Sequence, residues 1–173
     1  MKYLLGALFA VLLSTNTLFA QQDNLQYPEL KVKEDYAKSE LLFQQVTDWL
    51  TDTDLDKQPD VRQKSSAFIL SWLMGSPTVT FPVDKHTVDL FTDNPNLLMI
   101  YAANYGNYCI SNKEDKSFVA PAKAGLQAVV EVYKKGIAIT HTALLQALVK
   151  AADANKLDDY ITKNMKGEIK AKG

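Results

Sequence analysis

Residues 67–74 read AFILSWLM and belong to the most apolar helix that the sequence predicts. Pro59 suits the first position of this helix, and Gly75 suits its end. A helix that is apolar nearly all round is buried on most of its sides. The stretch therefore predicts a central helix over residues 59–75, with Trp72 in the middle of the core.

An amphipathic helix is predicted before this stretch, starting near residue 35. Its apolar residues recur at spacings of three and four, whereas polar residues such as Thr47 take the opposite face. Trp49 lies near the end of the helix and is expected to be partly exposed. The buried face would consist of Ser39, Leu42, Phe43, Val46, Trp49 and Leu50.

Further helices are predicted to start near residues 84, 95, 121, 140 and 156. Asn94 followed by Pro95 is typical of a helix start, and Thr140 could cap a later helix. Prolines bracket the short β-branched and aromatic run after residue 77, which favours an extended connector. We therefore predict an all-α fold, a compact irregular bundle of about six or seven helices. At most one short extended segment is expected, near residues 78–83.

Tyrosines recur at helical spacing within the helix predicted from residue 95. Tyr101, Tyr105 and Tyr108, with Asn104 beside them, could line a ligand groove because tyrosine combines a flat apolar ring with a polar tip. Helical spacing favours the alternative in which these rings fill the core. Gly106 lies among them and suggests the close approach of a neighbouring helix.

The first 20 residues have the layout of a secretory signal peptide. Lys2 precedes an apolar run, and Ala20 is the small residue before the expected cut. The run is about half as long as the roughly 20 apolar residues of a transmembrane helix. We therefore expect a periplasmic or secreted protein that does not insert into the membrane after signal removal. A polar extended lead-in (21–33), one helical domain (34–165) and a lysine-rich tail (166–173) would follow.

Composition and charge exclude several classes of protein. Removing residues 1–20 from the 173 leaves 153, enough for one domain with its own core. The formal net charge of −1 argues against a nucleic-acid binder, which usually concentrates basic residues. Cys109 is the only cysteine, so the chain has no internal disulfide framework.

Candidate catalytic and metal-binding residues are few. His86 and Asp89 have the three-residue spacing that places two ligands on one helix face, but His141 would have to come from a distant helix to complete a zinc site. Residues 52–56 alternate acidic side chains like a calcium loop, yet lack its glycine and its final glutamate. We therefore expect no catalytic site, no metal and no cofactor.

The chain resembles small secreted helical proteins of unknown function from Bacteroidota. The resemblance rests on the end of the signal and on two stretches, residues 66–77 and 94–101. It implies no known activity and no catalytic residues.

These observations favour an exported, soluble, non-enzymatic helical protein that binds a partner protein or belongs to an envelope assembly. An unrecognised hydrolase or metal-dependent enzyme using His86, Asp89 and His141 is one alternative. A small-ligand carrier with a tyrosine-lined groove is the other. Proximity of the two histidines would favour the enzyme, and a cavity beside Tyr105 would favour the carrier.

Overall fold

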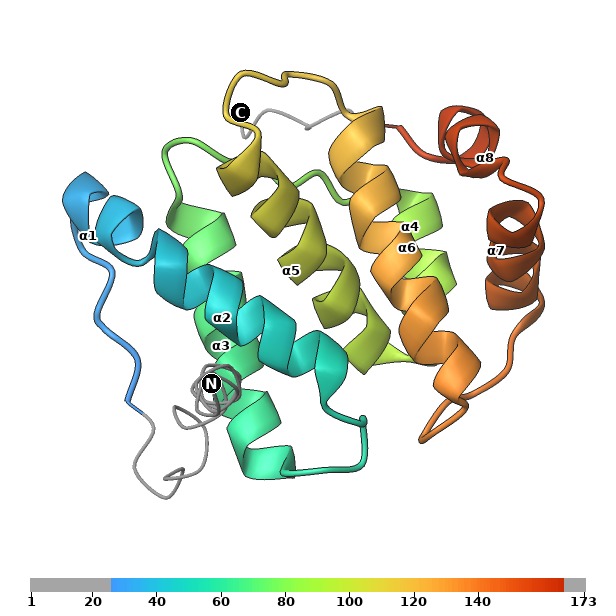
Figure 1. Ribbon diagram of the computed structural model, residues 1–173, viewed down its shortest axis with the longest axis horizontal. Helices are drawn as coiled ribbons and strands as arrows, with labels where there is room; N and C mark the ends of the chain where they lie inside the picture. The colour runs from blue at the N-terminus through green and yellow to red at the C-terminus, as the bar shows by residue number, and fades with distance from the viewer. Residues whose placement is uncertain (1–25, 167–173) are drawn as a thin grey trace, which may run out of the picture.

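The computed structural model describes residues 26–166, which form eight α-helices and no β-strand (Figure 1). The predicted all-α class is confirmed, with one helix more than the upper end of the prediction. The predicted signal peptide and residues 167–173 of the predicted tail lie outside the described residues. The helices are α1 (Lys33–Lys38), α2 (Glu40–Asp52), α3 (Pro59–Gly75), α4 (Lys85–Phe91), α5 (Pro95–Ser111), α6 (Val119–Lys135), α7 (Ala143–Asp153) and α8 (Leu157–Asn164).

The additional helix arises at Ser39, where the helix predicted from residue 35 divides into α1 and α2. The Ser39 hydroxyl donates a hydrogen bond to the Asp35 carbonyl at 2.6 Å, which competes with the regular helical bonding. The described residues before α1, 26–32, contain no helix, and residues 21–25 of the predicted lead-in lie outside the described residues. Because α1 is short and has no buried residue, it serves to turn the chain from this segment into α2.

Helix α5 is the centre of the bundle. It packs most extensively against α6 and also contacts α2, α3 and α4. Figure 1 shows α5 and α6 side by side, with α2 next to α5 and with α7 and α8 at the far edge beyond α6. These neighbours cover nearly its whole circumference, and its buried residues are Leu97, Ile100, Tyr101, Ala102, Ala103, Tyr105, Gly106 and Ile110.

Helix α3 is less central than its sequence predicts. Its inner face is buried, and Trp72, with none of its surface exposed, packs 4.5 Å from the ring of Phe43. Its outer face is not covered, because α2 and α5 are the helices against which it chiefly packs. Leu70 keeps 47% and Met74 78% of their surfaces exposed. The prediction of burial on most sides is therefore wrong for α3 and describes α5 instead.

Two glycines allow α5 to approach its neighbours closely. A Cβ atom on Gly106 would lie 2.7 Å from Cζ of Phe43 on α2, so the close approach suggested by the sequence is present. A Cβ on Gly125 of α6 would lie 2.7 Å from the backbone carbonyl oxygen of Tyr101. Both distances are too short for a side chain, and α6 therefore packs directly on the backbone of α5.

Arg62 of α3 holds the end of α2 from inside the fold. Its guanidinium donates hydrogen bonds to the carbonyls of Leu50, Thr53 and Asp54 at 3.1, 2.7 and 3.1 Å, and lies 5.5 Å from the ring centre of Trp49. The first of these bonds satisfies a carbonyl in the last turn of α2, which the helix end leaves unpaired, and the other two hold the loop that follows. Under this arginine, Trp49 keeps only 9% of its surface exposed, and the prediction of a partly exposed ring is wrong.

Thr47 is the second residue of α2 that the sequence misplaces. It is fully buried, although its polar side chain predicts a position on the outer face. Its hydroxyl donates to the carbonyl of Phe43 at 2.8 Å, one turn earlier in the same helix. A threonine that satisfies its own hydroxyl in this way can be buried like an apolar residue.

Asn94 and Thr140 join two loops instead of capping their helices. The Asn94 side chain exchanges two hydrogen bonds of 2.8 Å with the backbone of Thr140. Helix α7 therefore begins later than predicted, with Thr142 as the residue whose hydroxyl accepts from the backbone of Leu145. The pair fixes the turn between α4 and α5 against the loop between α6 and α7.

Candidate functional site

A groove of about 540 Å³ runs between α3 and residues 26–32, which we call the extended segment. Residues 27–31 form one wall of this α3 groove, and Tyr36 of α1 adds to it. The other wall is a single helix face, because its residues lie three or four positions apart. Those residues are Lys64, Ala67, Phe68 and Ser71. The volume lies within the range of about 300–1,000 Å³ that is typical of ligand sites.

Tyr27 fixes the extended segment to α3. Its ring stacks on the ring of Phe68, with the centres 4.5 Å apart and the planes 10° from parallel. Its hydroxyl shares a hydrogen bond of 2.7 Å with the hydroxyl of Ser65. Burial raises the pKa of Tyr27, and the bond to Ser65 offsets only part of this rise. The phenol is therefore neutral over the physiological range.

The other end of the extended segment is fixed at α1. The carboxylate of Asp35 accepts hydrogen bonds from the backbone N–H groups of Lys31 and Val32, at 2.9 and 3.0 Å. The bond from Val32, followed by that from Lys31, lowers the pKa of Asp35. Tyr36 adds a hydrogen bond of 3.4 Å from its hydroxyl to the carbonyl of Leu30. Held at both ends, the wall of the groove is preformed.

The α3 groove combines an apolar lining with one unpaired positive charge. Tyr27, Leu30, Ala67 and Phe68 supply aromatic and aliphatic surface. Lys31 forms an ion pair with Glu29, whereas Lys64 takes part in none of the ion pairs among residues 26–166. The lining includes no histidine and no cysteine. The arrangement suits the binding of an apolar group that carries a negative charge at one end.

The tyrosines predicted to line a groove lie elsewhere. Tyr101 and Tyr105, which are 0% and 4% exposed, pack in the core with Phe81, whose ring centre lies 5.5 and 5.2 Å from theirs. Burial raises the pKa of both hydroxyls. Asn104 donates a hydrogen bond of 3.0 Å to Thr51 on α2. None of these residues contributes to the lining of the α3 groove.

Tyr108, the last of the residues predicted to line a groove, points toward the loop between α5 and α6. Its hydroxyl donates to the carboxylate of Asp115 at 2.8 Å, and this bond is the main reason that its pKa is raised. Cys109, next to it, is half-buried, and burial raises the pKa of its thiol to about 11. At neutral pH this cysteine is a thiol and not the reactive thiolate.

The two histidines have separate tyrosine partners. Nε2 of His86 lies 3.0 Å from the hydroxyl of Tyr160 on α8, and Nδ1 of His141 lies 2.6 Å from the hydroxyl of Tyr133 on α6. Asp89 forms an ion pair with Lys85 at 2.5 Å. Within residues 26–166, no group of three or more histidine, cysteine, aspartate or glutamate side chains is placed to hold a metal ion.

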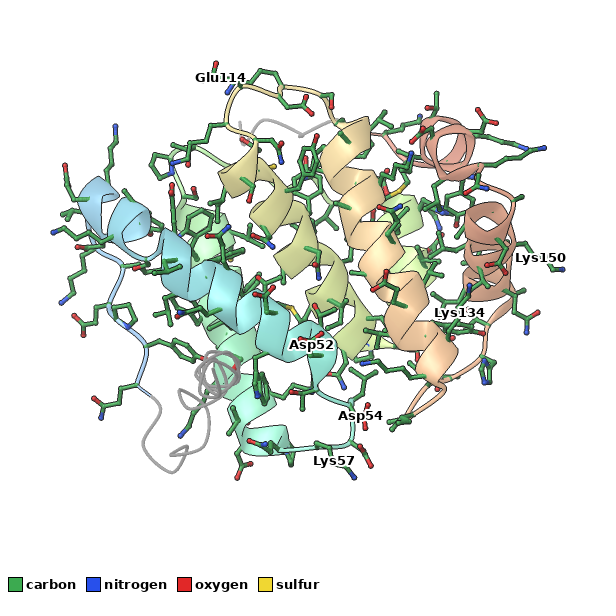
Figure 2. All side chains as sticks on the ribbon, viewed as in Figure 1. Asp52, Asp54, Lys57, Glu114, Lys134 and Lys150 are labelled. Carbon is green, nitrogen blue, oxygen red and sulfur yellow. The ribbon has the colours of Figure 1, made fainter. Side chains whose placement is uncertain are left out.

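The acidic loop between α2 and α3 is a structural connection. Figure 2 shows Asp52, Asp54 and Lys57 around this loop. Leu55 in its middle is buried, and Arg62 binds the loop carbonyls from the inside. The carbonyl of Gln58, the backbone ligand that a calcium loop starting at Asp52 would use, already accepts a hydrogen bond of 2.9 Å from the backbone N–H of Arg62.

The α3 groove is not predicted by any pattern in the sequence. Residues 21–33 were predicted as a polar lead-in, although Tyr27 and Leu30 are apolar residues within it that pack on the core. These two residues are the signal that the segment contains, but local periodicity cannot tell that they face α3. The exposed positions Lys64, Ala67 and Ser71 become a wall only when the extended segment lies beside them.

Comparison of the chain with protein-family models, with curated proteins and with solved structures gives no significant match. The resemblance to secreted Bacteroidota proteins therefore stays a prediction from the sequence. No helix within residues 26–166 is long and apolar enough to cross a membrane.

Proposed function

We propose that this protein is an exported, non-enzymatic helical protein that binds a partner protein through the α3 groove. The observation that carries the proposal is the groove itself, an open groove of about 540 Å³ between α3 and the extended segment, whose ends are held by hydrogen bonds. Its aromatic and aliphatic lining and its unpaired Lys64 are features of a binding surface. Its position on an exposed face of the bundle makes it accessible to a macromolecule.

Export is the second element of the proposal, and it rests on the first 20 residues. The charged start, the short apolar run and Ala20 support cleavage after residue 20 and a periplasmic or secreted location. Intact mass of the protein recovered from the envelope and from the medium tests this element. A product that begins at Gln21 is expected, whereas a product that keeps Met1 would contradict export by cleavage.

The partner-binding element is tested by photo-crosslinking in the producing cell. A photoreactive amino acid replaces Ala67, which lines the groove, or Ala147, an exposed alanine of α7 that serves as the matched control. We expect a cross-link from position 67 that maps to one segment of one partner protein. Filling the groove with Ser71→Trp should remove this product. Equal products from positions 67 and 147, or none from position 67, would overturn the proposal.

A further inference from the structure

We propose that the α3 groove binds the C-terminal end of a partner protein as a short, extended, apolar peptide whose free carboxylate contacts Lys64. This inference rests on the proposed function, because it names the chemistry of the partner at the same site. Three features of the groove support it: its length, its unpaired lysine and the backbone groups along its wall that make no hydrogen bond.

The length of the groove matches about three extended residues. Its helical wall runs from Lys64 to Ser71, seven positions along α3. At a rise of 1.5 Å per residue this wall is about 10 Å long. An extended chain advances about 3.3 Å per residue, so three residues span the same distance.

The charges of the groove favour binding of a ligand with an anionic group. Glu29 and Lys31 neutralise each other in an ion pair on one wall, and Lys64 is the one charged residue of the lining that has no ion-pair partner within residues 26–166. Asp60 lies one turn before Lys64 on α3, but the two side chains do not form an ion pair. A ligand carboxylate at this end would meet a cation that is free to pair.

The backbone of the extended segment favours a peptide over another apolar acid. Within residues 26–166, the N–H groups of Tyr27 and Glu29 and the carbonyls of residues 27–29 make no hydrogen bond. An extended peptide beside this segment could pair with such groups, as in the addition of a strand to an exposed backbone edge. The rings of Tyr27 and Phe68 would receive its apolar side chains.

The test is a calorimetric titration of the full mature chain with an N-acetylated Leu-Val-Phe peptide, in its free-acid and C-terminal amide forms. We expect saturable binding of the acid and three- to fivefold weaker binding of the amide, as for an accessible ion pair. Lys64→Gln should weaken binding of the free-acid peptide by the same factor and leave the affinity for the amide peptide unchanged. Ala67→Leu should abolish binding of both peptides by filling the groove.

Matched controls are available on α7, at the far edge of the bundle from the extended segment. Lys150→Gln and Ala147→Leu make the same substitutions at exposed positions, and Figure 2 shows Lys150 on the side away from that segment. Both should bind the acid like the wild type. All four variants should keep the wild-type melting temperature, because each replaced residue is exposed.

Three results would overturn the inference: no saturable binding, equal affinity for acid and amide, or equal effects of Lys64→Gln and Lys150→Gln. A concentration-dependent dimer that the peptide dissociates would also overturn it, since the occupant would then be a second copy of the chain. Any of these results together with a specific cross-link from position 67 would leave the proposed function standing. Loss of that cross-link as well would overturn both.

Discussion

Helices α3 and α5 are alike in sequence and different in their surroundings. Each is 17 residues long, begins with proline and contains a run that is apolar around most of the helix, which in α3 is residues 67–74. Helix α5 packs against α2, α3, α4 and α6, and its apolar residues are buried on nearly every side. Helix α3 lies beside α2 and α5 and leaves Leu70 and Met74 exposed. Apolar composition therefore sets how much surface a helix can bury, and its neighbours decide how much it does bury.

This difference explains why the groove lies at α3 and not at α5. The extended segment covers one strip of α3 through Tyr27 and Leu30, and the groove lies along that cover. Around α5, by contrast, the glycines at 106 and 125 let neighbouring helices pack directly against it. The same apolar character thus supports the core at one helix and a candidate binding surface at the other.

The largest effect is expected at the inner face of α3. Trp72→Ala removes a ring with no exposed surface and the hydrogen bond of 3.1 Å from its Nε1–H to the carbonyl of Tyr36. Deletion of a buried aromatic ring leaves a cavity and typically costs about 3–5 kcal/mol. Chemical denaturation should show this loss in the free energy of unfolding. A wild-type midpoint for Trp72→Ala would contradict the burial of this face.

Arg62→Met should have the next largest effect, at the start of α3. The substitution keeps an unbranched side chain but leaves the carbonyls of Leu50 and Thr53 without their donor, whereas the carbonyl of Asp54 still accepts from the backbone N–H of Lys57. Loss of hydrogen bonds to a charged donor predicts a destabilisation of about 2–3 kcal/mol. Arg62→Lys, which keeps the charge but only part of the donor geometry, should lie between Arg62→Met and the wild type. A neutral Arg62→Met would show that the α2–α3 connection does not depend on this contact.

Much of the fold can be read from local sequence signals. The periodicity of apolar residues predicts the helices, and the punctuation by Pro59, Pro95 and Gly136 agrees with observed helix ends. Asn155 adopts the left-handed conformation, with φ of 54°, that is expected at a helix end. These features depend on residues that are close in the sequence, so local patterns are sufficient to find them.

The remaining features depend on contacts between distant residues. Asn94 is of a residue type that commonly caps helices, yet its side chain forms hydrogen bonds with the backbone of Thr140, 46 positions away. The α3 groove needs the extended segment and α3 together. No local pattern contains these pairings, and the centre of the bundle was assigned to the wrong helix for the same reason.

Gly125→Ala tests how tightly α5 is enclosed. The added methyl group would meet the carbonyl oxygen of Tyr101 at 2.7 Å, and backbone cannot move away as a side-chain end can. Overpacking of this kind costs about 1–3 kcal/mol, while alanine regains roughly 1 kcal/mol of helix propensity. We expect a net loss of up to about 2 kcal/mol in the free energy of unfolding. Increased stability would show that α5 and α6 have room to separate.

The smallest effect is expected on the outer face of α3, where one substitution can be compared between the two helices. Met74→Gln on α3 and Met99→Gln on α5 exchange residues of nearly equal helix propensity, so any difference reflects burial. Met74 is 78% exposed and should change the free energy of unfolding by no more than about 0.5 kcal/mol. Met99 is half-buried against the core and should lose about 1 kcal/mol. Equal losses, measured by chemical denaturation, would mean that the outer face of α3 is covered in solution, and sedimentation of both variants would then show whether a second copy covers it.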